Sequence, residues 1–171
     1  MYEVAQAAQN KQKQEYGEQF SATDALDTAM SAANQVYMRH VKVARIALRG
    51  QRGAAEALQL TGRRQQSYSG WIKQASIFYT NALIDEGVKT ALSSFGITEQ
   101  ALQEGQDNVN DVQAKLAAQL KEKGEAQAST QERDQALEDL LDWMSDFVAI
   151  ARIALENDAQ LLEVLGIVEP S

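Results

Sequence analysis

Histidine and carboxylate side chains are the groups in this sequence that could perform acid–base or metal chemistry. His40 is the sole histidine and the chain has no cysteine, which excludes a two-histidine metal site, a thiolate zinc site, a cysteine nucleophile and an iron–sulfur cluster. A ferritin-like carboxylate centre needs a Glu three residues before a His on one helix face, and position 37 is Tyr. No phosphate loop, dinucleotide fingerprint, nucleophile elbow, zincin motif or EF-hand loop occurs. We therefore expect no enzymatic activity, no cofactor and no bound metal.

The aromatic side chains offer a second kind of chemistry, the binding of a small apolar ligand. Five of them could line an apolar pocket: Trp71, Phe78, Tyr79, Trp143 and Phe147. Aromatic residues at helical spacing are also the usual filling of a helical core. We therefore keep a small-ligand sensor or carrier bundle as the alternative function.

Basic residues are concentrated in one part of an otherwise acidic chain. The whole chain has 16 basic and 24 acidic residues, a net charge of −8, which argues against general nucleic-acid binding. Residues 39–73 nevertheless carry eight Lys and Arg against Glu56 alone, a net +7, so the remainder is net −15. Seven of these residues form a candidate docking face for a partner: Arg39, Lys42, Arg49, Arg52, Arg63, Arg64 and Lys73.

Three interpretations of this basic segment are open. In the first, residues 39–49 run antiparallel beside residues 98–111 and the charges pair internally, with carboxylates from Glu99, Glu104, Asp107 and Asp111 that set the register. In the second, the segment docks an acidic protein or another copy of the chain. In the third, it binds nucleic acid, with Tyr68 and Trp71 stacking on bases. Among external partners we expect a protein or a second copy, with nucleic acid less favoured.

The sequence contains an internal repeat. Residues 2–60 align without a gap on residues 109–167 at an offset of 107, and 17 of the 59 aligned pairs are identical. The identities include five consecutive residues, Ala44–Leu48 and Ala151–Leu155. A repeat of this length indicates one supersecondary unit used twice, each copy covering the apolar face of the other. His40 aligns with Phe147, so we expect it at an aromatic core position.

Apolar spacing predicts long amphipathic helices in both copies. In the second copy, apolar residues recur three and four apart, which indicates a buried helix face: Leu137, Leu140, Met144, Phe147, Ala151 and Ala154, widened by Trp143, Ile150 and Ile153. The corresponding face of the first copy runs from Met30 to Ala47. Thr98 is a suitable N-cap for the helix that opens the second copy. Between the copies we expect a helix over 67–83 and a shorter one over 87–97.

The stretches around Gly17 and Gly124 decide whether each copy is a hairpin. Ser129 and Glu132 fit a capping box, and Ser21 with Asp24 is a weaker version. We therefore expect a turn in each copy and paired helices of about 27 residues. The rival is one uninterrupted helix, because the 3.5-residue apolar phase continues across these stretches.

The predicted fold is all-α, an antiparallel helical bundle or coiled coil built from two homologous hairpins. It forms a single domain over 1–171, with repeat 1 at about 2–60, a central helical insert at 61–97 and repeat 2 at about 98–167. Arg45 and Arg152 occupy matching positions in the two copies. We expect the stem of each to lie on apolar surface while its guanidinium meets a carboxylate of the other hairpin.

The composition favours a soluble protein of the interaction class. No stretch is apolar for long enough to span a membrane or to serve as a signal-peptide core. The compartment stays open, with the cytoplasm favoured. Residue 98 aligns with a position before Met1, so we also expect the natural chain to begin earlier. The predicted function is a non-catalytic structural or protein-interaction module that docks a partner, or another copy, through charged helix faces.

Overall fold

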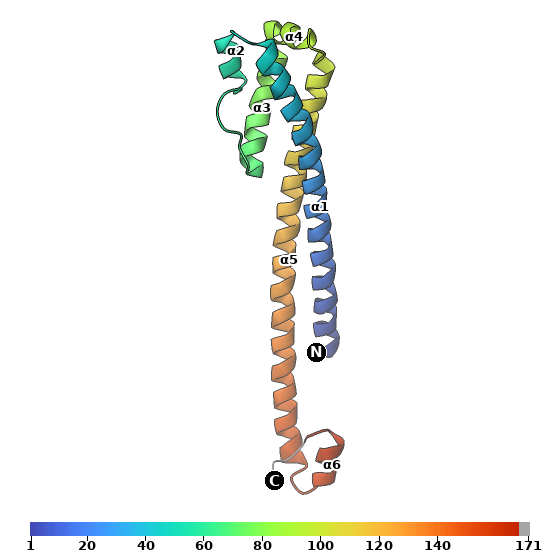
Figure 1. The fold of residues 1–171 in the computed structure, drawn as a ribbon. Helices are drawn as coiled ribbons and strands as arrows, with labels where there is room; N and C mark the ends of the chain where they lie inside the picture. The colour runs from blue at the N-terminus through green and yellow to red at the C-terminus, as the bar shows by residue number, and fades with distance from the viewer. Residues whose placement is uncertain (168–171) are drawn as a thin grey trace. The chain divides into compact units, whose positions relative to one another are not determined.

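The computed structural model describes residues 1–167, and this part of the chain is all-helical. Its helices are α1 (Tyr2–Ala47), α2 (Arg52–Ala57), α3 (Tyr68–Ile84), α4 (Glu86–Ser93), α5 (Glu99–Ala154) and α6 (Ala159–Val164) (Figure 1). The chain divides into two compact units. We call Gln19–Glu122 the central unit, and Met1–Glu18 together with the chain from Lys123 onward the terminal unit. Both long helices run through both units, and the expectation of one domain over 1–171 stays a prediction.

The turns expected at Gly17 and Gly124 are wrong. Both glycines lie inside continuous helices, α1 and α5. A helical glycine costs only about 1 kcal/mol relative to alanine, and no proline follows to stop either helix. The continuous apolar phase therefore outweighs the weak capping signals at Ser21 and Ser129. Ser129 instead donates its hydroxyl to the carbonyl of Ala126 at 3.0 Å.

Helix starts in the middle of the chain follow from short polar side chains that cap exposed backbone N–H groups. Ser67 accepts from Gly70 N at 3.2 Å at the start of α3, and Asp85 accepts from Val88 N at 3.1 Å at the start of α4. Thr98 accepts from Ala101 N at 3.1 Å, which confirms it as the N-cap of α5. These caps fix where α3 and α5 begin beside α1.

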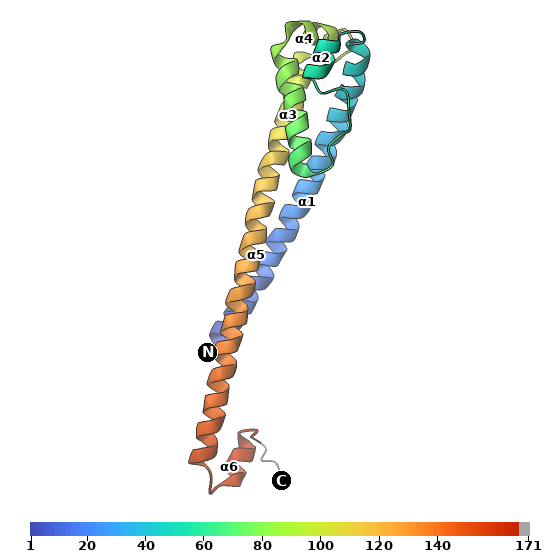
Figure 2. The same cartoon turned by 90° about the vertical axis from the view of Figure 1, so that its left-hand side faces the viewer.

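The central unit contains the main hydrophobic core. In both views α3 lies alongside the second half of α1 and the first part of α5 (Figures 1 and 2). The core residues of the three helices are Leu26, Ala33, Tyr37, Val41 and Ala44 on α1; Trp71, Ala75, Phe78, Tyr79 and Ala82 on α3; and Leu102, Val109 and Val112 on α5. The predicted burial of the first-copy face is confirmed at Ala33, Tyr37, His40 and Ala44.

The terminal unit packs the start of α1 against the second half of α5 through small residues. Ala5, Ala126 and Ser129 are buried there, and Lys11 Nζ lies 2.7 Å from Glu132 Oε2. Figures 1 and 2 show α5 continuing past the N-terminal end of α1. At its far end α6 folds back, and Ala151, Leu162 and Ile167 form a small second core.

The burial predicted for the second-copy face is wrong over most of its length. Ala151 is buried, but the larger apolar residues of that face are exposed by 41 to 74%: Leu137, Trp143, Met144, Phe147, Ile150 and Ile153. The start of α1 borders this face at Leu137. From Trp143 onward, no described residue of the terminal unit covers it as α3 covers the face around Tyr37. The spacing of apolar residues predicts which side of a helix favours burial, but it does not predict whether another helix covers that side.

The segments that follow α1 and α5 are alike in structure. α1 ends at Ala47 and α5 at Ala154, and α2 and α6 both span six residues, Arg52–Ala57 and Ala159–Val164, so all these bounds differ by 107. The backbone bonds correspond too, since Leu60 N donates to Ala55 O at 2.9 Å and Ile167 N to Leu162 O at 3.0 Å. Residues 47–60 and 154–167 share four of fourteen residues, yet both end the long helix and form a short returning helix at matching positions.

Candidate functional site

The exposed apolar face at the end of α5 is the first candidate site. We call it the stripe and define it by Leu137, Leu141, Trp143, Met144, Phe147, Ile150 and Ile153. The rings of Trp143 and Phe147 are stacked, with centroids 5.6 Å apart and an interplanar angle of 15°. Large apolar groups gathered on one face in this way mark a binding surface rather than scattered surface residues.

Carboxylates line the other side of the same helix segment. Glu138, Asp142 and Asp146 recur at four-residue spacing and therefore lie along one ridge of α5. All three are exposed, and residues 137–150 contain no Lys or Arg. The stripe thus has an acidic border, and its surface favours a partner that is both apolar and basic.

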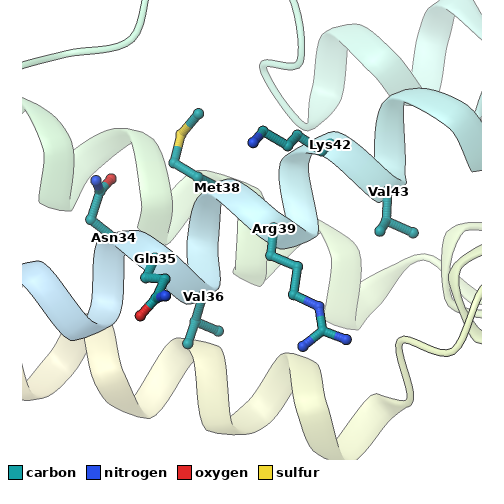
Figure 3. A pocket seen from close by; sticks show the side chains of 7 residues that line it. All are labelled: Asn34, Gln35, Val36, Met38, Arg39, Lys42 and Val43. Atoms are coloured by element: carbon teal, nitrogen blue, oxygen red, sulfur yellow. The ribbon is translucent and has the colours of Figure 1, made fainter.

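A hollow on the outer face of α1, in the central unit, is the second candidate site. We call it the basic hollow; it is lined by Asn34, Gln35, Val36, Met38, Arg39, Lys42 and Val43, and its volume is about 740 Å³. Figure 3 shows Met38 and Lys42 on one side of α1, with Val36, Arg39 and Val43 on the other. Val36, Met38 and Val43 are half-buried and their lining is mainly apolar, whereas Arg39 and Lys42 are exposed.

The predicted docking face divides into free and engaged cations. Among residues 1–167, six of its members make no ion pair and are exposed: Arg39, Lys42, Arg49, Arg52, Arg63 and Lys73. Arg64 is engaged, since it donates to the Tyr37 hydroxyl at 2.9 Å, to Thr61 O at 3.0 Å and to Gln59 O. Arg64 therefore contributes to the fold of the central unit, and its part in a docking face stays a prediction.

The internal pairing proposed for residues 39–49 does not occur in the described chain. Glu99 instead pairs with Lys89, at 3.3 Å, while Glu104 and Asp107 accept from the glutamines four residues before them. Arg45 also differs from expectation, because its Nε donates to the carbonyl of Leu60 at 3.0 Å and not to a carboxylate. The basic charges of the outer α1 face are thus left for solvent or a partner.

The residues of the predicted aromatic pocket are found in two groups. Trp71, Phe78 and Tyr79 are together in the core of the central unit, with exposures of 3, 0 and 0%. The ring of Tyr37 packs edge-on against Phe78 at 5.6 Å and against Trp71 at 5.8 Å. Trp143 and Phe147 belong to the stripe of the terminal unit. The ligand-carrier alternative stays a prediction, and the first group has the close packing of a filled core.

Polar groups inside this aromatic core are paired with one another. His40 Nδ1 lies 3.1 Å from the Tyr79 hydroxyl, and Trp71 Nε1 donates to Asn34 Oδ1 at 2.8 Å. Burial, with the nearby Arg39 charge as a second cause, lowers the pKa of His40 from 6.5. Burial raises the pKa of Tyr79, and the neighbouring Tyr37 adds to this. Both shifts favour the neutral form of the group. His40 is buried, as its alignment with Phe147 predicts.

No sequence pattern predicts the Arg64–Tyr37 and Trp71–Asn34 hydrogen bonds. Each joins residues far apart in the chain, with separations of 27 and 37 positions. A buried Trp or Tyr does require a partner for its polar atom, but the sequence does not say which one. Asn34 accepts the hydrogen bond from the Trp71 indole and also lines the basic hollow. This hydrogen bond therefore connects one edge of the hollow to the core.

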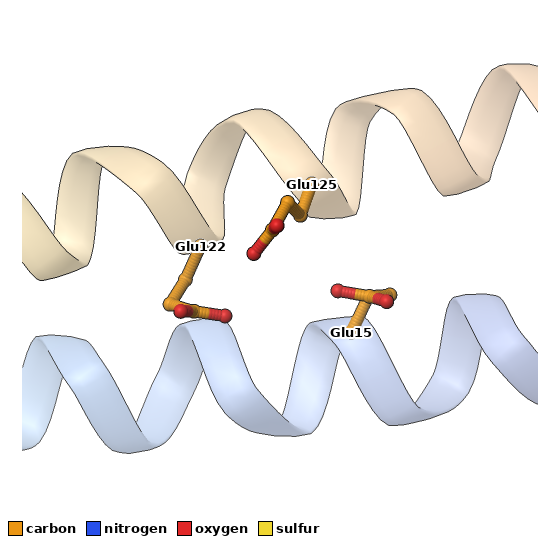
Figure 4. A group of neighbouring side chains, drawn as sticks. All are labelled: Glu15, Glu122 and Glu125. Carbon is orange, nitrogen blue, oxygen red and sulfur yellow. The ribbon is translucent and has the colours of Figure 1, made fainter.

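Two carboxylates face each other in the terminal unit. The side chains of Glu15 on α1 and Glu125 on α5 lie between the two helices (Figure 4), with carboxylate oxygens within 4.8 Å of each other. The pKa of Lys11 is raised, first by its hydrogen bond to Glu132 and further by the charges of Glu15 and Glu125. Exposed and half-buried carboxylates often gather in this way without binding an ion, so these carboxylates carry no functional assignment.

Comparisons with known proteins provide no functional evidence, so the functional argument is made from the structure. No protein-family model, no curated protein and no solved structure matches the chain. No helix among residues 1–167 combines the length and the apolar character needed to cross a membrane.

Proposed function

We propose that the chain is a non-catalytic protein-interaction module that binds a basic, apolar helix along the stripe of α5. The observation that carries this proposal is the exposure of the stacked pair Trp143 and Phe147, 52% and 45%, on a helix segment whose other side is acidic. Burying an aromatic or large aliphatic side chain is worth about 1.5–3 kcal/mol. Several such residues on one side of α5 therefore provide enough free energy for a helix-on-helix contact.

The internal repeat supports the same proposal. If residues 2–60 and 109–167 are two copies of one unit, the apolar face around Tyr37 shows that such a face is buried by a neighbouring helix, because α3 covers it. The equivalent face around Met144 is uncovered within the terminal unit. A helix from another molecule would then take the place that α3 takes in the central unit.

The proposal is tested with a synthetic amphipathic peptide of Leu and Lys carrying a fluorescent label, and with a Leu and Glu peptide as the charge control. We expect the Leu–Lys peptide to bind the full chain with a dissociation constant in the micromolar range, about −8 kcal/mol, and the Leu–Glu peptide to bind at least tenfold more weakly. Fluorescence anisotropy measures both.

The matched variants place the binding on the stripe. The double substitution Trp143→Ser and Phe147→Ser is expected to abolish binding of the Leu–Lys peptide. The control pair Ile84→Ser and Phe95→Ser removes two exposed apolar side chains, 74 and 53% exposed, from the central unit, and should leave binding unchanged. Equal loss in both variants, or no binding by the unsubstituted chain, would contradict the proposal.

A further inference from the structure

Two surfaces of this chain have opposite charge and similar apolar character. The stripe, on the terminal unit, is bordered by Glu138, Asp142 and Asp146. The basic hollow, on the central unit, carries Arg39 and Lys42, which make no ion pair in residues 1–167. Each surface lies on the exposed side of a single long helix, so both are open to another molecule.

The basic hollow has the features that a partner of the stripe requires. Half-buried Val36, Met38 and Val43 give it an apolar lining, and because α1 alone lines it, the hollow is open to solvent and to a partner's helix. Ile46, 52% exposed, continues the apolar surface along the same side of α1. Arg39 and Lys42 lie on the same face, between Met38 on one side of α1 and Val36 and Val43 on the other (Figure 3). Charged groups placed there guide association and set register.

We propose that the stripe of one molecule docks on the basic hollow of a second copy, so that the chain assembles head to tail. The inference rests on the proposed function and names its partner. Apolar side chains around Trp143 and Phe147 lie on Val36, Met38 and Val43, and the carboxylates of Asp142 and Asp146 face Arg39 and Lys42. The contact is heterologous, so assembly either continues with one free stripe and one free hollow at its ends, or closes into a ring in which every stripe and hollow is occupied; the smallest ring is a pair of copies that dock reciprocally.

The alternative self-contact, stripe against stripe, is electrostatically poorer. It would bring together two helix segments that each carry Glu138, Asp139, Asp142 and Asp146 and no cation between residues 137 and 150. Like charges placed across an interface cost several kcal/mol. Docking on the basic hollow buries the same apolar groups while opposing the carboxylates with free cations, which is why the second copy is expected to present α1 and not α5.

The experiment uses two variants of the full chain, each defective in one surface. The stripe variant carries Trp143→Ser and Phe147→Ser, and the hollow variant carries Arg39→Glu and Lys42→Glu. A control variant, Arg63→Glu and Lys73→Glu, makes the same charge change at two free cations outside the hollow. Light scattering and analytical ultracentrifugation give the mass of each protein, and circular dichroism shows that each retains its helices.

Head-to-tail assembly predicts a specific set of masses. The wild type and the control variant form species larger than a dimer, or a closed ring, at about 100 μM and low salt, and assembly weakens at about 1 M salt, where the Debye length is near 3 Å. Each surface variant alone is monomeric. An equal mixture of the two gives a dimer and nothing larger, because one intact stripe and one intact hollow remain in the pair.

Other results overturn the inference and are distinguishable from failure of the proposed function. A hollow variant that assembles as well as the wild type, beside a monomeric stripe variant, indicates stripe-to-stripe contact. A wild type that stays monomeric while the Leu–Lys peptide still binds removes self-assembly but keeps the interaction module. A wild type that neither assembles nor binds the peptide removes both.

Discussion

A Cβ atom on Gly105 would lie 2.3 Å from the ring of Tyr79, a distance that real Cβ contacts essentially never show. α3 and α5 therefore approach each other closely because position 105 has no side chain. The hydroxyl of the same tyrosine lies 3.1 Å from His40 Nδ1 on α1. Tyr79 thus touches both long helices of the central unit and fixes how α3 is placed between them.

Substituting alanine for glycine should change the free energy of unfolding in opposite directions at positions 105 and 124. Gly105→Ala should lower the free energy of unfolding by about 1–3 kcal/mol, because overpacking of a rigid ring outweighs the gain in helix propensity. Gly124→Ala, where a Cβ would meet nothing within 4 Å, should raise it by up to about 1 kcal/mol. Urea unfolding measures both, and two changes of the same sign would contradict the described packing.

His40 should make the stability of the chain depend on pH. Burial lowers the pKa of folded His40 from 6.5, so below about pH 6.5 the unfolded chain binds a proton that the folded chain does not. The free energy of unfolding should therefore decrease as pH falls through 6.5 toward the lower pKa of the folded state. His40→Phe, which copies the residue at the aligned position 147, should lack this term. Urea unfolding at several pH values measures the free energy of unfolding of both proteins. As pH falls below 6.5, the wild type should lose more of it than the variant, and a difference that does not change with pH would contradict the burial of His40.

Substitutions in the stripe should separate function from stability. Trp143→Ser and Phe147→Ser should each change the free energy of unfolding of the monomer by no more than about 0.5 kcal/mol, as is usual for surface positions. Phe78→Ala, at a fully buried position, should cost about 3–5 kcal/mol. The measurement is made at a concentration where no assembly occurs. A large loss at Trp143 would mean that the stripe is part of the chain's own core.

Local sequence was sufficient to predict much of the central unit. Ser67 and Thr98 were recognisable as caps or helix starts, and the spacing around Tyr37 indicated a buried face, because these depend on residues within a few turns. The aligned position of His40 and Phe147 likewise suggested a core location for His40. In each case the decisive interaction is local or is specified by helical spacing.

The errors arise where a distant element decides the outcome. The same spacing that buries the face around Tyr37 leaves the face around Met144 exposed, because α3 covers the first and no described residue of the terminal unit covers the second. Arg45 finds the carbonyl of Leu60 instead of a carboxylate, which depends on how the chain returns after α2. The basic hollow could not be predicted from the sequence, since its shape depends on how the side chains of α1 are arranged in space.

The exposure of Trp143 tests the central claim most directly. In a chain whose Trp71 is replaced by Phe, Trp143 is the remaining tryptophan, and its emission and acrylamide quenching report that position alone. We expect a red-shifted, readily quenched emission in the dilute monomer, and a blue-shifted, protected emission when the Leu–Lys peptide is added. An indole that is already blue-shifted and protected in the dilute monomer, or one that the saturating peptide leaves unchanged, would contradict the assignment of the stripe as a binding surface.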